Sequence, residues 1–204
     1  MKRLGKMALA VCLCILFLAG CGEARVPDVV EAPTVAVSRE GEIRVWQVGD
    51  FDKSYYNVAE LNNMASEEAK DYNATLGREA VAVEKTEALE GSGKVVVSYR
   101  FDGWESCGAF CESSIFYGTM KEAVQNGFYS NDAVKELVMK NVKDGTAYDG
   151  EISQETDSCL IVTDMKANIY CPGKVTYISE GAVVNADGSV SSFEAEGPVY
   201  ILLK

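Results

Sequence analysis

The sequence predicts an α+β fold with a mainly antiparallel sheet, one long helix, one or two short helices and a β-rich C-terminal third. Three observations predict it: short links between strand-like runs, one clear helical repeat, and the dominance of strand-like runs in the last third. Most of these links are too short for a crossover, so neighbouring strands are expected to pair antiparallel. The sequence shows no fixed-period repeat, which excludes a repeat architecture.

Two hairpins are expected in the first half of the chain. Apolar residues alternate through 34–48 on either side of a turn at 39–42. Residues 80–84 and 94–101 are rich in β-branched side chains and flank the glycine-containing turn 90–93.

A long helix is expected between the two hairpins. Asn57 is a good N-cap, Glu60 follows three positions later, and Gly77 ends the pattern. The apolar residues at helical spacing are Val58, Leu61, Ala65, Ala69, Tyr72 and Leu76. Together with the hairpins, this helix gives the order ββαββ.

The second half predicts shorter elements. We expect a helical turn at 104–111, a strand at 114–117 and a short helix opened by the capping box Thr119 to Glu122 and closed by Gly127. Segment 134–142 fits helix and strand about equally well, with a helix favoured at its start. The remaining expected strands are 159–163, 168–171, 174–179, 189–194 and 199–203, with a turn at 185–188.

The N-terminus has the pattern of an export signal. Lys2, Arg3 and Lys6 precede an unbroken apolar run from Met7 to Leu18. As a helix, these residues would cover about 18 Å, whereas the hydrocarbon core of a bilayer is about 30 Å thick. A cleaved signal is therefore expected in preference to a membrane-spanning anchor.

The run ends in Leu18-Ala19-Gly20-Cys21, which resembles the lipobox of bacterial lipoproteins. The resemblance covers residues 1–22 and implies a diacylglyceryl group on the sulfur of Cys21, cleavage before that residue, and a location on the extracytoplasmic face of the cell membrane. Two acyl chains give stable anchoring where one does not. The alternative is an ordinary secretory signal, whose small-x-small cleavage site Ala19-Gly20-Cys21 would match only poorly.

Three parts of the chain are expected. Residues 1–20 form the signal peptide. Residues 21–33 form a lipidated N-terminus and tether, because they lack strand or helix periodicity and contain two of the four prolines. Residues 34–204 are long enough for a single domain with a sizeable core.

The charge of the mature chain excludes one class of partner. Removal of residues 1–20 leaves 16 basic and 31 acidic residues, a formal charge of −15. Such a surface repels the phosphates of nucleic acid, so no nucleic-acid partner is expected. It also repels anionic headgroups, so lipid on Cys21 alone is expected to hold the protein at the membrane.

The absence of histidine from the sequence removes the commonest general base, the commonest metal ligand and every catalytic triad built on imidazole. Acidic residues are plentiful, but no pair is singled out by the pattern. Neither a phosphate-binding glycine loop nor a calcium loop is present. We therefore expect no cofactor and no metal, and assign no catalytic residue.

Four cysteines remain in the mature chain, and outside the cytoplasm an even number favours disulfides. Cys159 and Cys171 flank an apparent hairpin centred near Met165, which would place them opposite each other. Cys107 and Cys111 are spaced as i and i+4, so a bond between them requires a departure from helical geometry. Crossed pairing stays open. The spacings do not match a thioredoxin-type redox motif or a four-thiolate zinc site.

Three short stretches carry a second resemblance: Asp50-Phe51-Asp52-Lys53, Phe116-Tyr117-Gly118-Thr119, and residues 172–181. With them, residues 42–203 resemble a group of uncharacterised lipoproteins from anaerobic Gram-positive bacteria. The resemblance implies the lipid anchor and the α+β fold, and it implies no activity.

The anchor, the tether and the missing catalytic residues favour a non-enzymatic surface module that binds a partner or ligand. An aromatic set is the candidate lining of its site: Trp104, Phe110, Phe116, Tyr117, Phe128 and Tyr129. The alternatives are an envelope hydrolase that uses carboxylates, a thiol–disulfide protein that uses Cys107 and Cys111, and an assembly subunit with an exposed apolar patch.

Overall fold

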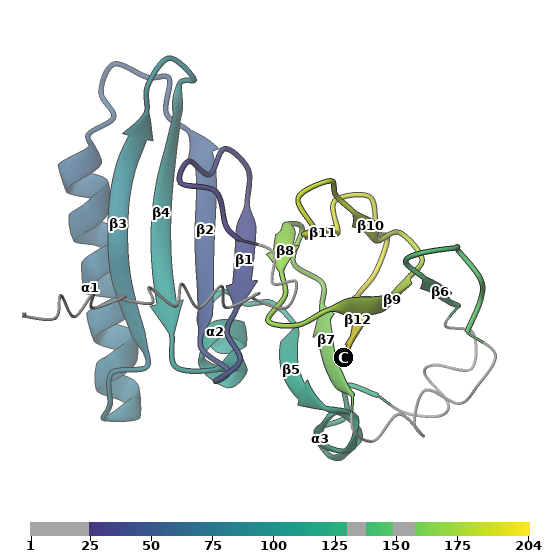
Figure 1. The fold of residues 1–204 in the computed structure, drawn as a ribbon. Coiled ribbons are helices and arrows are strands. Elements are labelled where there is room, and N and C mark those ends of the chain that lie inside the picture. Colours follow the sequence, from purple (N-terminus) through teal and green to yellow (C-terminus); the bar gives the residue numbers. More distant parts are fainter. Residues whose placement is uncertain (1–24, 130–137, 149–157) are drawn as a thin grey trace, which may run out of the picture.

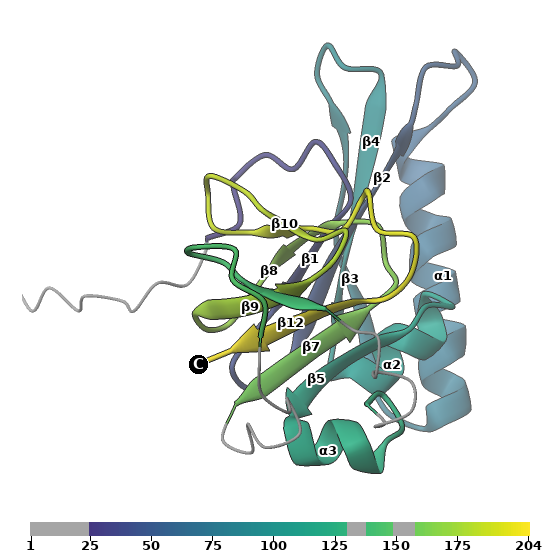
Figure 2. The same cartoon turned by 90° about the vertical axis from the view of Figure 1, so that its right-hand side faces the viewer.

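The computed structural model describes residues 25–129, 138–148 and 158–204, and these residues form two sheets with three helices (Figures 1 and 2). The first sheet has seven strands in the order β10-β11-β8-β1-β2-β4-β3, and the second has five in the order β5-β7-β12-β9-β6. All strand pairs are antiparallel except β1 with β8. The predicted α+β class with mainly antiparallel pairing is therefore confirmed.

The predicted ββαββ order forms one half of the first sheet. It consists of β1 (Thr34–Val37), β2 (Ile43–Asp50), β3 (Val81–Leu89) and β4 (Lys94–Phe101). β1 pairs with β2 and β2 pairs with β4 in unbroken register, whereas the β3–β4 register shifts between Val83 and Lys85. β3 extends five residues beyond the predicted end of its strand at 84, because its pairing with β4 continues to the turn.

Helix α1 (Val58–Leu76) packs along one edge of the first sheet, against β3 (Figure 1). The side chain of Asn57 accepts hydrogen bonds from the backbone N–H groups of Ala59 and Glu60, which confirms the predicted N-cap. Gly77 ends the helix in the left-handed conformation, with φ of +66°. The helix buries the small side chains of Ala65 and Ala69, so it approaches the sheet closely.

Two short helices follow the first sheet, and the first of them leads from that sheet to the second. Helix α2 (Trp104–Phe110) follows β4, β5 (Ile115–Thr119) starts the second sheet, and α3 (Met120–Gln125) follows at once. The predicted capping box opens α3: the hydroxyl of Thr119 accepts from the N–H of Glu122, and the carboxylate of Glu122 accepts from the N–H of Thr119.

The second sheet is completed from the C-terminal third. Its other strands are β6 (Met139–Asn141), β7 (Cys159–Thr163), β9 (Val175–Ser179) and β12 (Val199–Leu203). Three shorter strands, β8 (Asn168–Tyr170), β10 (Val183–Val184) and β11 (Val190–Ser191), join the first sheet instead. The predicted strand at 189–194 is only two residues long. For segment 134–142, residues 139–141 are strand, and 134–137 lie outside the described residues.

The predicted hairpin centred near Met165 is wrong. β7 pairs with β5 and β12, whereas β8 pairs with β1 and β11, so the two strands belong to different sheets. The link between them is held from both sides: the N–H of Asp164 donates to the carbonyl of Ser114, and the N–H of Asn168 donates to that of Pro33. A crossing between sheets thus replaces the tight turn.

One apolar core joins the two sheets. It contains Val35, Ile43 and Phe101 from the first sheet together with Ile161 and Ile201 from the second, all at most 1% exposed. A smaller cluster on the other face of the second sheet surrounds Phe116, Met120, Leu160 and Leu202. Within the described residues, no helix is both long and apolar enough to cross a membrane.

The close contact of Gly181 with Ala195 generates a stability prediction. Gly181 has φ of +80°, and a Cβ atom there would lie 2.7 Å from the Cα of Ala195. Gly145 has a similar φ of +71° but open space around it. We expect Gly181→Ala to lower the free energy of unfolding by about 2 kcal/mol more than Gly145→Ala, because both variants carry the backbone strain and only the first also clashes. Urea unfolding measures the difference, and equal losses would contradict the close packing.

Candidate functional site

Three surface pockets are described, and one stands apart in size and lining. It has a volume of about 390 Å³, whereas the others have about 230 and 290 Å³. Pockets for small ligands measure roughly 300–1,000 Å³. We call the largest the aromatic hollow, and it is lined by Asp50, Phe51, Tyr55, Tyr56, Asn57, Glu60, Leu61, Met64 and Val95.

The aromatic hollow lies where β2 ends and α1 begins. Its loop is fixed at both ends, because the N–H of Phe51 donates to the carbonyl of Gly93 at 2.6 Å and Asn57 caps the helix. Between them, the N–H of Tyr56 donates to the carbonyl of Lys53 at 3.1 Å and closes a turn. The β3–β4 turn, the end of β2 and the start of α1 therefore hold the hollow together.

Three aromatic rings line the hollow, and the middle one, Tyr56, contacts the other two. The rings of Phe51 and Tyr56 are stacked with centroids 5.1 Å apart, and the ring of Tyr55 meets that of Tyr56 edge-on at 5.0 Å. Tyr55 is 74% exposed, and Met64 on the neighbouring turn of α1 is 67% exposed. Isolated exposed apolar side chains are ordinary, but a contiguous group around a hollow marks a binding surface.

The charged groups that line the hollow are both acidic. Asp50 and Glu60 are solvent-exposed, and neither forms an ion pair within 4.0 Å with any described residue. Lys53, on the same loop, pairs with the carboxylate of Asp52 at 2.9 Å. The hollow is thus aromatic on its walls and negative at its rim.

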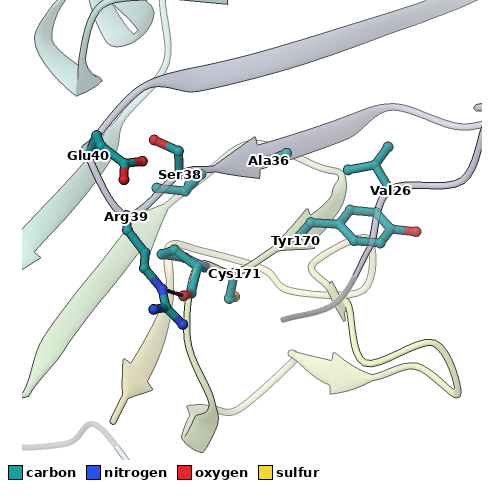
Figure 3. Close-up of a pocket in the computed structure, with 9 residues that line it drawn as sticks. Val26, Ala36, Ser38, Arg39, Glu40, Tyr170 and Cys171 are labelled. Carbon is teal, nitrogen blue, oxygen red and sulfur yellow. Dashed lines mark hydrogen bonds between the residues drawn. The ribbon is translucent and has the colours of Figure 1, made fainter. Parts of the chain in front are cut away.

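A second pocket lies between the β1–β2 turn and the end of β8 (Figure 3). Its walls include Val26, Tyr170 and Cys171, and the Nε–H of Arg39 donates to the carbonyl of Pro172. Burial and the hydrogen bond from its own hydroxyl to Asp187, at 2.6 Å, raise the pKa of Tyr170 to about 12. Its carboxylate partner has a lowered pKa, chiefly because of that same bond. These bonds fix the side chain of Tyr170 against the turn that carries Asp187.

The structure holds all four cysteines of the described residues as free thiols. Cys107 is fully buried in α2, and Cys111, at the end of that helix, is half-buried and lines the third pocket. The thiol of Cys107 hydrogen-bonds to Cys111, which lowers the pKa of Cys111 and raises that of Cys107. Their i, i+4 positions in an intact helix agree with the predicted obstacle to a bond between them.

The other two cysteines lie on different sheets. Cys159 begins β7 and pairs in register with Thr119 and Leu203, whereas Cys171 follows β8 and is buried. Burial raises the pKa of Cys171 to about 12. The hairpin register that suggested the Cys159–Cys171 bond does not exist, so this pairing loses its geometric argument and stays a prediction from compartment alone.

The structure does not place the six sequence-predicted aromatic residues around a described pocket. The six candidates, Trp104, Phe110, Phe116, Tyr117, Phe128 and Tyr129, are buried or half-buried, pack against the two core clusters, and line none of the three pockets. The ring centroid of Trp104 lies 5.4 Å from that of Phe116 and 5.1 Å from that of Phe128, as expected of core packing. The signal that sequence reasoning missed was the pair Tyr55-Tyr56, which stands immediately before the N-cap Asn57. These two large rings lie in a loop where neither helical nor strand periodicity predicts burial.

The described residues contain no group of three or more metal-ligating side chains. No family model matches the chain, and no curated protein and no solved structure matches it. Functional inference therefore depends on the geometry of the aromatic hollow and on the N-terminal sequence.

The thiols generate a reactivity prediction. In the reduced, folded protein, iodoacetamide will modify Cys111 before Cys107 and Cys171, because the thiolate is the reactive form and Cys111 combines partial exposure with a lowered pKa. Cys107→Ala removes the hydrogen-bond donor, so the pKa of Cys111 will rise and its alkylation will slow. Peptide mass spectrometry after timed quenching measures both rates.

Two outcomes would contradict this prediction. One is modification of buried Cys107 or Cys171 as fast as Cys111. The other is an unchanged rate of Cys111 alkylation in the Cys107→Ala variant.

Proposed function

We propose that this chain is a lipid-anchored, extracytoplasmic binding module whose recognition site is the aromatic hollow. The observation that carries the proposal is the contiguous exposure of Tyr55, Tyr56 and Met64 around the largest pocket described. Burying such groups against a ligand is favourable by roughly 25 cal/mol for each Å² of apolar surface removed from water. Within the described residues, no other element of the fold buries these three side chains.

The N-terminal sequence supports the location. Cys21 stands at the end of the lipobox-like tetrapeptide, and residues 25–33 contain no helix or strand. Val30 is nonetheless buried, and the carbonyl of Glu31 accepts a hydrogen bond from the Nζ of Lys94. The tether is therefore held to the domain before residue 33, and from Cys21 to Val30 the chain reaches at most about 32 Å.

The tether attaches beside the hollow. Lys94 is the cross-strand partner of Asp50, which lines the hollow, and its Nζ lies 3.4 Å from the carbonyl of Glu31. Glu31 follows Cys21 by ten residues, so the strand end that carries the hollow would stay within about 36 Å of a lipid on that cysteine. This arrangement suits a ligand encountered close to the membrane surface.

A carboxylate hydrolase has weaker support. Asp50 and Glu60 line one pocket, which is the arrangement such an enzyme needs, but both carboxylates are exposed to solvent. A carboxylate pair that acts as general acid and base works in a site that excludes water, and solvent exposure does not provide that. The same two carboxylates can bind a positively charged or hydrogen-bonding ligand while they remain exposed to solvent.

The test compares three full-length proteins in intact cells after chemical crosslinking: native, Tyr55→Ala and Phe193→Ala. Phe193 is a matched control, since it is an exposed aromatic residue, 38% exposed, that does not line the hollow. We expect Tyr55→Ala to reduce the yield of the native crosslinked species at least fivefold and Phe193→Ala to leave it unchanged. Quantitative mass spectrometry of the captured material measures the yields.

A Cys21→Ala variant tests the anchor in the same cells. We expect the native chain to incorporate labelled fatty acid and this variant not to, because the lipid attachment site is gone. Incorporation by the variant, or none by the native chain, would overturn the anchor. Loss of the crosslinked species in Phe193→Ala but not in Tyr55→Ala would overturn the assignment of the hollow.

A further inference from the structure

We infer that the aromatic hollow binds a small organic cation, a molecule that presents an ammonium group on an apolar body. The inference rests on the proposed function, because it names the ligand chemistry of the same site. It follows from the walls, the rim charges, the blocked helix end and the size of the hollow.

The rim charges select for a cation. Asp50 and Glu60 line the hollow without a basic counterpart in its lining, and Lys53 is engaged by Asp52. The chain as a whole carries a formal charge of −12. A negatively charged surface attracts cationic ligands and raises their local concentration. An anionic ligand would meet two uncompensated carboxylates.

The aromatic walls select for an organic cation. The faces of tyrosine and phenylalanine rings are electron-rich and attract ammonium groups within about 6 Å of the ring centre. Tyr55, Tyr56 and Phe51 supply three such rings, with Tyr56 in contact with the other two, and Tyr55 is largely open to solvent. Leu61 and Val95 add apolar lining for the body of the ligand. A bare metal ion would need several oxygen ligands at once, which two exposed carboxylates do not supply.

The start of α1 also lines the hollow, and a helix N-terminus usually favours an anion. Here three of its donors are occupied: the side chain of Asn57 accepts from Ala59 at 2.8 Å and from Glu60 at 3.3 Å, and its carbonyl accepts from the N–H of Leu61. The helix dipole is equivalent to roughly half a positive charge. Asp50 and Glu60 carry two negative charges, so the groups that line the hollow remain net negative with the dipole included.

The test uses the methyl group of Met64 as a reporter in the folded full-length protein. Met64 lines the hollow, whereas Met120 and Met139 are buried in the smaller core cluster and serve as internal controls. Three probes of nearly equal size and shape are titrated: tetramethylammonium, tert-butanol and pivalate. They are cationic, neutral and anionic, respectively.

We expect tetramethylammonium to shift the Met64 methyl signal in a saturable way at concentrations where tert-butanol and pivalate do not, and to leave the Met120 and Met139 signals in place. Asp50→Asn and Glu60→Gln should each weaken the cation about fivefold, the effect of one unit charge close by in water. Tyr55→Phe should bind as the native protein does, and Tyr55→Leu should bind several times more weakly, because leucine keeps the apolar body and loses the ring.

The outcomes separate this inference from the proposed function. If tert-butanol shifts Met64 as strongly as tetramethylammonium, or if the two carboxylate variants bind the cation unchanged, the hollow still binds ligands and the cation inference is wrong. If none of the probes shifts Met64 at any concentration while the protein stays folded, both the inference and the assignment of the hollow are overturned.

Discussion

The apolar core shared by the two sheets is the constraint on which the rest of the structure depends. Neither sheet is covered on its inner face by helices alone, so each buries that face against the other. The parallel pairing of β1 with β8 brings Val35 beside Ile169 and joins the N-terminal hairpin to the C-terminal third. Phe110 then packs against Tyr72, Tyr99 and Phe101, with ring centroids 5.4–5.5 Å away, so α1 and α2 are fixed to the same core.

The hollow lies at the end of the first sheet that does not pack against the second sheet. β2 and β4 extend beyond the region that faces the second sheet, and Asp50 and Lys94 form their last pair. The core therefore fixes the start of α1 and the end of β2. In the loop between them, Phe51 is half-buried, whereas Tyr55 is exposed to solvent. The proposed binding surface lies there, where rigid elements hold both ends of a short loop that leaves Tyr55 and Tyr56 exposed.

Local sequence patterns were enough to predict most helices and strands. Long-range packing determined which sheet each strand joins and which aromatic side chains are buried. The N-cap Asn57, the capping box at Thr119 and both N-terminal hairpins depend on neighbours in sequence, and the structure has them where predicted. The link from β7 to β8 has the spacing of a tight hairpin but crosses between sheets, which only the bonds of its ends to distant strands reveal. The choice of aromatic residues from the sequence was limited for the same reason. Aromatic content alone does not distinguish Phe116, which is buried, from Tyr55, which is exposed.

Native-state hydrogen exchange tests most directly whether the two sheets form one cooperative unit. Ile169 on β8 is fully buried in the shared core, so Ile169→Ala should lower stability by about 2–4 kcal/mol. We predict that the slowest-exchanging amides of β4 and of β12 lose the same free energy of opening in this variant. A loss confined to the first sheet, with β12 still protected as in the native protein, would contradict the shared core.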